Sequence, residues 1–242
     1  IQSYGTISDA IAYTYQQEGH AFYVLIFPDA GKTWVYDVAV NSWHERAGFS
    51  VGEFVRHRSN CHAAYNNDPH VGDFENGNIY TLDLAIYEDN GLPQKWLRSW
   101  RAIPTGQNDL KRTTQHALQI DCESGIGLSG IEPLSVESYI PLTTETDTVL
   151  LTESGTELLL ADSGTQGVDP QVMLRFSDDG GHTWSNERWA SMGRIGQYSK
   201  RVIFRRLGMT TKLRDRVYEV SGTDPVKIVI MGADLAIDGT NG

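Results

Sequence analysis

The side chains whose types best suit chemistry crowd into one stretch, which holds His57, Cys61, His62, Asp68, His70 and Asp73. Imidazole, thiolate and carboxylate groups bind transition metals, and a thiolate beside an imidazole can act as a nucleophile. However, the spacing of His57, Cys61 and His62 matches no zinc-binding pattern, and closeness in sequence does not set hydrogen-bond geometry. We therefore expect loop histidines, no metal, no cofactor and no nucleophile built on Cys61 or Cys122.

A second stretch is rich in basic side chains, although the whole chain carries a formal net charge of -11. Its members are Arg194, Lys200, Arg201, Arg205, Arg206, Lys212, Arg214 and Arg216, set against Asp215 alone. Such a cluster suits DNA or an acidic surface on a neighbouring protein. The alternative, which most charge runs follow, is pairing with carboxylates elsewhere in the chain.

A third pattern, SDDGGHTW at residues 177–184, fits S-x-D-x-G-x-T-W at every fixed position. The fixed positions are Ser177, Asp179, Gly181, Thr183 and Trp184. The hydroxyl and carboxylate can bond to backbone groups of a turn, the glycine pair permits positive φ, and the tryptophan anchors a hairpin in its sheet. The pattern therefore predicts a structural clasp and no catalytic residue.

The elements that must position these residues are short strands between turns. Residues 10–15, 21–27 and 33–38 combine apolar, aromatic and β-branched side chains, the turn signals QQEG and PDAG separate them, and Trp43 opens a further strand. A four-stranded meander of this length is what one β-propeller blade needs. We predict an all-β, β-propeller-like fold.

A looser second unit follows, with strands expected at residues 61–65 and 79–83. Trp96 and Trp100 lie four residues apart, which fits a helical turn and an irregular strand equally well. Residues 113–122 alternate in the manner of a strand.

We divide the chain into three parts. Residues 1–134 are expected to hold propeller-like blades, residues 135–169 an inserted Thr/Ser/Glu-rich β-hairpin or loop, and residues 170–242 the blade with the SDDGGHTW turn and the closing strands. Within the insertion, residues 144–151 and 152–159 form a near-repeat whose composition argues against a helix. Their apolar ends favour either a subunit contact or disorder.

The composition is that of a folded protein, with 40% hydrophobic and 21% charged residues. Its 24 glycines, 11 tyrosines and 6 tryptophans favour short strands and tight turns. No apolar run is long enough to span a membrane, so we expect no membrane contact. Two cysteines do not make a disulfide scaffold, and we expect both to be reduced. Because the first residue is not Met, we expect a processed product or a piece of a longer chain.

Two motifs resemble those of known propellers. Trp34-x-Tyr36-Asp37, followed by NSW at residues 41–43, resembles a kelch-type blade. The pattern at residues 177–184 resembles the Asp-box of sialidases and other propellers, which lies away from their active sites and so implies architecture only. A sialidase-like site would also need an arginine cluster, a Tyr–Glu pair and an acid–base Asp, which the sequence does not place.

The last third of the chain carries a broader resemblance. The runs VMLRFSDDGGHTWSNERWASMG, RIGQYSKRVIFRRLG and DRVYEVSGTDPVKIVIMGADLAI, between residues 172 and 237, are similar to the C-terminal region of packaged-DNA-stabilisation proteins of short-tailed phages. These are also called tail hub or nozzle proteins. The resemblance implies a virion tail component, assembled in the bacterial host cytoplasm, that seals packaged DNA below the portal and its adaptor and takes part in DNA ejection.

The resemblance also implies partners but no catalytic residues. The expected partners are further copies in a hexameric ring, the portal adaptor, the tail needle and tailspike proteins, and DNA in the channel. The alternative function is a sialidase-like propeller that binds or hydrolyses glycans, with aromatic side chains such as Tyr13, Tyr23, Trp96 and Trp100 stacking on sugars. A third reading is a monomeric adaptor, which the oligomeric state would distinguish.

Overall fold

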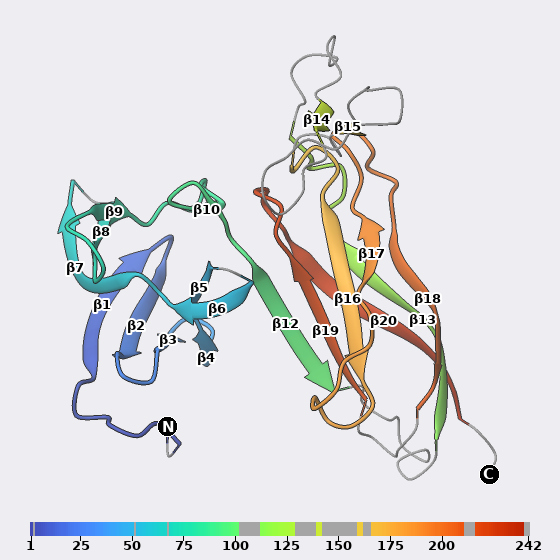
Figure 1. The fold of residues 1–242 in the computed structure, drawn as a ribbon, viewed down its shortest axis with the longest axis horizontal. Helices are drawn as coiled ribbons and strands as arrows, with labels where there is room; N and C mark the ends of the chain where they lie inside the picture. Colours follow the sequence, from blue (N-terminus) through green and yellow to red (C-terminus); the bar gives the residue numbers. More distant parts are fainter. Residues whose placement is uncertain are drawn as a thin grey trace. The chain divides into compact units, whose positions relative to one another are not determined.

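The computed structural model describes residues 1, 3–50, 52–66, 68–101, 112–128, 139–141, 159–161, 166–210 and 216–239. The chain divides into two compact units, Ile1–Lys95 and Trp96–Gly242. In the described ranges both units are built from strands and contain no helix (Figure 1), so the predicted all-β class is confirmed. None of the described residues forms a helix long and apolar enough to cross a membrane.

The first unit begins with an antiparallel meander in the order β1-β2-β3-β4. Its strands are β1 (Ile11–Gln17), β2 (His20–Phe27), β3 (Lys32–Asp37) and β4 (Ser42–Glu45). Three smaller groups of strands follow. They are a hairpin of β5 (Ala47–Ser50) and β6 (Glu53–Arg56), a second meander of β7 (Ser59–Tyr65), β8 (Asp68–Asp73) and β9 (Ile79–Thr81), and a short pair of β10 (Glu88–Asp89) and β11 (Leu92–Pro93).

Alternation along the strands builds the core of this unit. Val24, Ile26 and Val35 are fully buried, and they lie on one face of the first meander because side chains two apart in a strand share a face. Polar contacts then join the two meanders. The Tyr13 hydroxyl donates to Ser59 Oγ at 2.8 Å, across strands β1 and β7.

The second unit is a β-sandwich of two antiparallel sheets. The first sheet has the order β12-β19-β16-β17 and the second the order β18-β13-β20. The strands of the first are β12 (Trp96–Arg101), β16 (Gln171–Ser177), β17 (Arg188–Ser191) and β19 (Val217–Gly222); those of the second are β13 (Thr113–Cys122), β18 (Val202–Met209) and β20 (Ile230–Gly239). One buried cluster takes Leu174 and Tyr218 from the first sheet and Leu118 and Phe204 from the second, so the two sheets enclose a common core.

This architecture corrects the propeller interpretation for residues 170–242. We expected a blade and its closing strands there, but β16, β17 and β19 share a sheet with β12, whereas β18 and β20 flank β13. Alternation shows that a strand has a buried face without saying which strand lies beside it. Pairing across more than 100 residues therefore escaped the sequence analysis.

The insertion expected at residues 135–169 lies mostly outside the described residues, and so does most of the near-repeat at 144–159. In the described part, β14 (Tyr139–Pro141) pairs antiparallel with β15 (Leu159–Ala161).

Candidate functional site

The turn at residues 177–184 is organised around the carboxylate of Asp179. This carboxylate accepts hydrogen bonds from the backbone N–H groups of His182 (2.9 Å) and Thr183 (2.8 Å), and from the hydroxyl groups of Ser177 (2.6 Å) and Thr183 (2.7 Å). The Ser177 hydroxyl oxygen accepts from the backbone N–H of Gly181 at 2.9 Å, and Gly181 has a φ of 104°. Glycine adopts this conformation without the strain that other residues meet.

The same donors hold the pKa of the Asp179 carboxyl well below its usual range, with the Ser177 hydroxyl contributing most. A carboxylate with this many donors is a good turn former and a poor proton donor. The geometry thus suits a structural clasp.

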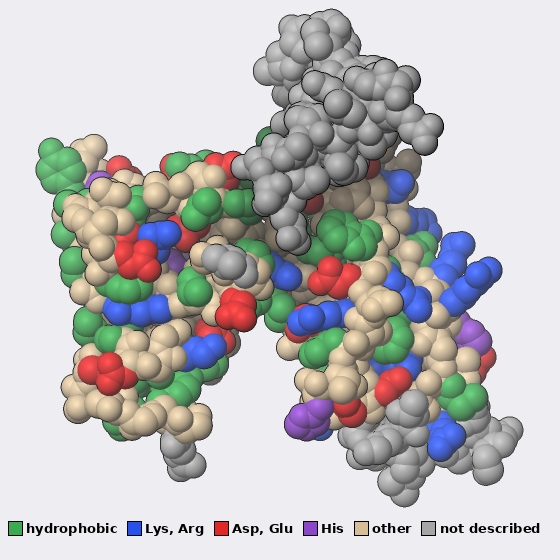
Figure 2. Space-filling view, viewed as in Figure 1, with side chains coloured by type: hydrophobic (Ala, Val, Ile, Leu, Met, Phe, Trp, Pro, Cys, Tyr) green, Lys and Arg blue, Asp and Glu red, His purple; other side chains and the backbone are tan. Residues whose placement is uncertain are grey.

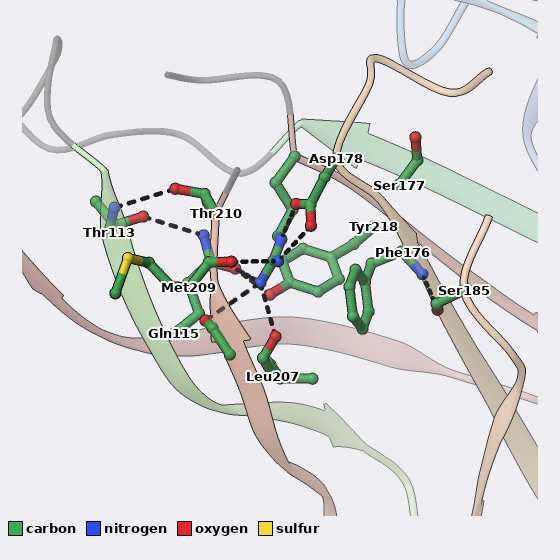
Figure 3. A network of polar contacts seen from close by, with 12 residues as sticks. Thr113, Gln115, Phe176, Ser177, Asp178, Ser185, Leu207, Met209, Thr210 and Tyr218 are labelled. Atoms are coloured by element: carbon green, nitrogen blue, oxygen red, sulfur yellow. Dashed lines mark hydrogen bonds and ion pairs between the residues drawn. The ribbon is translucent and has the colours of Figure 1, made fainter. Parts of the chain in front are cut away.

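The residue next to Asp179 belongs to a second network, centred on Arg216. The Arg216 side chain is only 2% exposed. Its guanidinium donates to both carboxylate oxygens of Asp178, from Nε at 2.6 Å and from Nη2 at 2.8 Å. It also donates to the backbone carbonyls of Leu207 (2.9 Å) and Met209 (3.2 Å). Asp178 follows β16 and both carbonyls belong to β18, so Arg216 ties the two sheets together. Figure 3 shows Asp178, Leu207 and Met209 around this network.

Aromatic groups complete this network. The centre of the Arg216 guanidinium lies 4.5 Å from the centroid of the Phe176 ring, and the Tyr218 hydroxyl donates to Gln115 Oε1 on the opposite sheet. Burial alone would lower the pKa of Arg216, but the carboxylate of Asp178 raises it above its ordinary value. The arginine therefore stays charged and fully engaged inside the protein.

The structure corrects the expectation that Arg216 faces DNA or a neighbouring ring, because its guanidinium is buried and its donors are hydrogen-bonded to groups within the chain. Sequence reasoning also missed Asp178 and Gln115 as its partners. One sequence signal was available: Arg216 directly precedes VYEVSG, whose valines and tyrosine favour a strand, and the structure buries every residue of that strand.

The other basic residues behave differently. All five side chains of Arg194, Lys200, Arg201, Arg205 and Arg206 are exposed, and none forms an ion pair with a carboxylate in the described part of the chain. Figure 2 shows Lys and Arg side chains gathered over β17 and β18, at the right of the view. Lys212 and Arg214 lie outside the described residues. Pairing within the chain therefore accounts for Arg216, and the arginines along β18 form an exposed basic face without an ion pair among the described residues.

The backbone beneath this face is already partly used. Arg188 Nη1 donates to the carbonyls of Arg205 (2.8 Å) and Arg206 (3.2 Å), from the neighbouring edge of the other sheet. A pocket of about 430 Å³ opens beside the two arginines. Its lining comprises Thr114, Gln115, His116, Ala117, Arg205, Arg206 and Gly208. Two exposed cations beside a pocket suit an anionic group.

The crowded His–Cys stretch of the first unit lies on the paired strands β7 and β8 and just before β7. His57 Nδ1 lies 2.7 Å from Ser59 Oγ, but Ser59 is fully buried and cannot meet a substrate. Burial, reinforced by Arg46 and Arg58, lowers the pKa of His57 to about 3. Cys61 is a free, exposed thiol. No group of three or more His, Cys, Asp or Glu is placed to hold a metal within the ranges described above.

Two pockets bear on the glycan alternative. The larger one, of about 570 Å³, lies in the first unit between the β1–β2 turn and residues 81–84 and has no arginine in its lining. The pocket beside Arg205 and Arg206 has no Tyr or Glu. Neither gathers three arginines beside a Tyr–Glu pair, which a sialidase-like site would need.

A comparison with known protein families bears on the sandwich. Residues 142–238 match the family Bacteriophage P22 Gp10, beta-sandwich. The match covers less than half of the chain and includes strands β16 to β20, while β12 and β13, which complete the two sheets, precede it. No curated protein matches the sequence. The chain is thus similar to a structural phage protein in the residues that form most of the sandwich.

Proposed function

We propose that this chain is a non-enzymatic structural component of the tail of a short-tailed phage, acting as a tail hub or nozzle. In this role it seals packaged DNA below the portal and its adaptor and takes part in DNA ejection. One observation carries the proposal: the residues that match the Bacteriophage P22 Gp10 beta-sandwich are residues that form a sandwich in this structure.

The chemistry of the described residues supports a structural role. Catalytic groups combine access with a poised protonation state. Here Asp179 is committed to its turn, Arg216 is buried against Asp178, and the His57–Ser59 pair is closed off by the burial of Ser59. These three perturbed groups are thus engaged with partners inside the fold.

Finer features of the same proposal concern architecture and partners. We place the four-stranded meander β1–β4 as a propeller blade and the turn at residues 177–184 as an Asp-box. We place the chain in the virion tail, in a homo-oligomeric ring of about six copies. Most soluble oligomers consist of identical chains related by closed symmetry. The portal adaptor, tail needle and tailspike proteins are its proposed neighbours, and the exposed basic face along β18 suits either acidic neighbours or channel DNA.

Deletion of the gene in the phage or prophage that encodes it tests this function. We expect particles that package DNA but fail to retain it and carry no complete tail, because the channel is left unsealed. Supplying the wild-type chain from a plasmid is the control and should restore DNA-filled, infectious particles. Normal tails and full DNA retention without the chain would reject the hub function, and a defect confined to glycan attachment would favour the glycan-binding alternative.

A further inference from the structure

The second sheet of the sandwich has edges of opposite charge. Its strand order is β18-β13-β20, so β18 and β20 are the outer strands. β18 carries the exposed Arg205 and Arg206, whereas β20 carries the exposed Asp234 and Asp238. Asp238 is additionally 2.8 Å from His116 Nε2, and its side chain is 77% exposed. One side of the sheet is therefore basic and the other acidic.

The register shows that these charges lie at one level along the strands. Ala117 of β13 pairs with Arg205 on one side and with Ala236 on the other. Cross-strand partners share a face of a sheet, so Arg205 lies level with Ala236, between Asp234 and Asp238, and on the same face. The flanking residues Phe204 and Leu235 pack against the core instead.

Apolar residues extend the correspondence between the two edges of the sheet towards the Cys122 end of β13. On the acidic side, Met231 of β20 is 66% exposed beside Ile230, which pairs with Cys122. On the basic side, Tyr198 is 74% exposed, and its carbonyl accepts from the hydroxyl of Ser124, just beyond the same end of β13. Starting from the Cys122 end of β13, both edges of the sheet therefore present an apolar side chain and then charged side chains.

Within the described ranges the acidic edge is also open. β20 is ten residues long, and among the described strands it pairs only with β13; the described residues make no further hydrogen bond to its backbone. A long exposed edge strand is a site where another chain can approach. The basic edge differs, because Arg188 and Arg216 already occupy carbonyls of β18. A partner at that edge is contacted by side chains and not by a continued backbone ladder.

We propose that the acidic edge (Ile230, Met231, Asp234 and Asp238) contacts the basic edge (Tyr198, Arg205 and Arg206) of a second copy of this chain. A head-to-tail neighbour with β20 alongside β18 brings opposite charges together and places apolar beside apolar. A two-fold contact between two β20 edges would instead bring aspartates against aspartates. Head-to-tail contacts repeat, so they close into a ring or extend as a filament. The inference rests on the homo-oligomeric ring of the proposed function and deepens it by naming the two edges that meet.

A complementary charge swap tests the contact in the full chain. Variant one carries Asp234→Lys and Asp238→Lys, and variant two carries Arg205→Glu and Arg206→Glu. Each has like charges at both edges, so each alone should associate at least about tenfold more weakly than wild type. An equimolar mixture should regain association, because each lysine edge then meets a glutamate edge. Sedimentation velocity over a concentration series measures this, with circular dichroism as the check on folding.

Controls and salt sharpen the outcome. Glu53→Lys and Arg98→Glu reverse exposed charges elsewhere and should leave association unchanged. Wild-type association should weaken between about 0.1 M and about 1 M salt, where the Debye length falls from about 10 Å to about 3 Å. A wild-type chain that stays monomeric at every concentration, a mixture that does not regain association, or single variants that associate like wild type would each overturn the proposed contact.

Discussion

Replacing Arg216 by Met tests the view that this arginine belongs to the core and not to an interface. The substitution removes two hydrogen bonds to Asp178 and the donors that Leu207 and Met209 use. Methionine can fill much of the same space with its unbranched side chain. The change therefore isolates the loss of the charged donors from the loss of packing.

The magnitude follows from burial. Removing one partner of a buried ion pair costs about 3–5 kcal/mol, because the other partner loses a charge–charge contact inside the protein. Here the side chain of Asp178 is 23% exposed, so water can reach it, and we expect a loss near the lower end, about 3 kcal/mol. Arg216→Lys keeps the charge but loses the two-pronged geometry, so we expect an intermediate loss of about 1–2 kcal/mol.

Urea unfolding of the full chain measures the loss, and hydrogen exchange of peptides from β18 and β19 localises it. Arg98→Met is the matched control, because Arg98 is exposed, has no ion pair in the described residues and lies outside the proposed contact; its substitution should change stability by less than about 0.5 kcal/mol. If Arg216→Met and Arg98→Met unfold at the same urea concentration, then Arg216 does not hold the sheets together as inferred.

Two further perturbations address the turn and His57. Asp179→Asn should lower the melting temperature by a few degrees, since the amide cannot accept hydrogen bonds from all the donors around the carboxylate. Glu187→Gln, on the nearby exposed surface, should leave the melting temperature unchanged. Equal melting temperatures for the two variants would contradict the structural role of Asp179 in the turn. The lowered pKa of His57 means that between about pH 6.5 and about pH 3 the unfolded chain binds a proton that the native chain does not, so stability falls as pH falls through this window. At about pH 5 the loss relative to neutral pH should be about 2 kcal/mol for this group, and His57→Gln should remove that part of the pH dependence; an unchanged slope in urea titrations would contradict the assignment.

Local patterns predicted many of the strands. Residues 113–122 were expected as a strand and form β13 (Thr113–Cys122), because alternation over ten residues is a strong signal. Residues 21–27 correspond to β2 within a residue. The tryptophans at 96 and 100 were ambiguous for a physical reason: a spacing of four puts both side chains on one face in a helix and also in a strand. Pairing with β19, far along the chain, decides for the strand.

Partnership between distant residues could not be predicted in the same way. Arg216 looked like one more cation in a basic run, yet it is buried because Asp178, β18 and Phe176 converge on it from separate parts of the sequence. Arg205 carries the same charge and stays exposed on the outer face of the sheet. Charge patterning counts cations but does not tell which face of a strand each one takes, so it merged a core residue with surface residues.

Electron cryo-microscopy of intact virions of the encoding phage tests the central claim, that this chain is a tail hub, most directly. We expect density for the two-sheet sandwich of residues 96–242 in the tail below the portal, repeated around the tail axis. Virions whose complete tail contains no density for this sandwich, or that place the chain outside the tail, would contradict the claim.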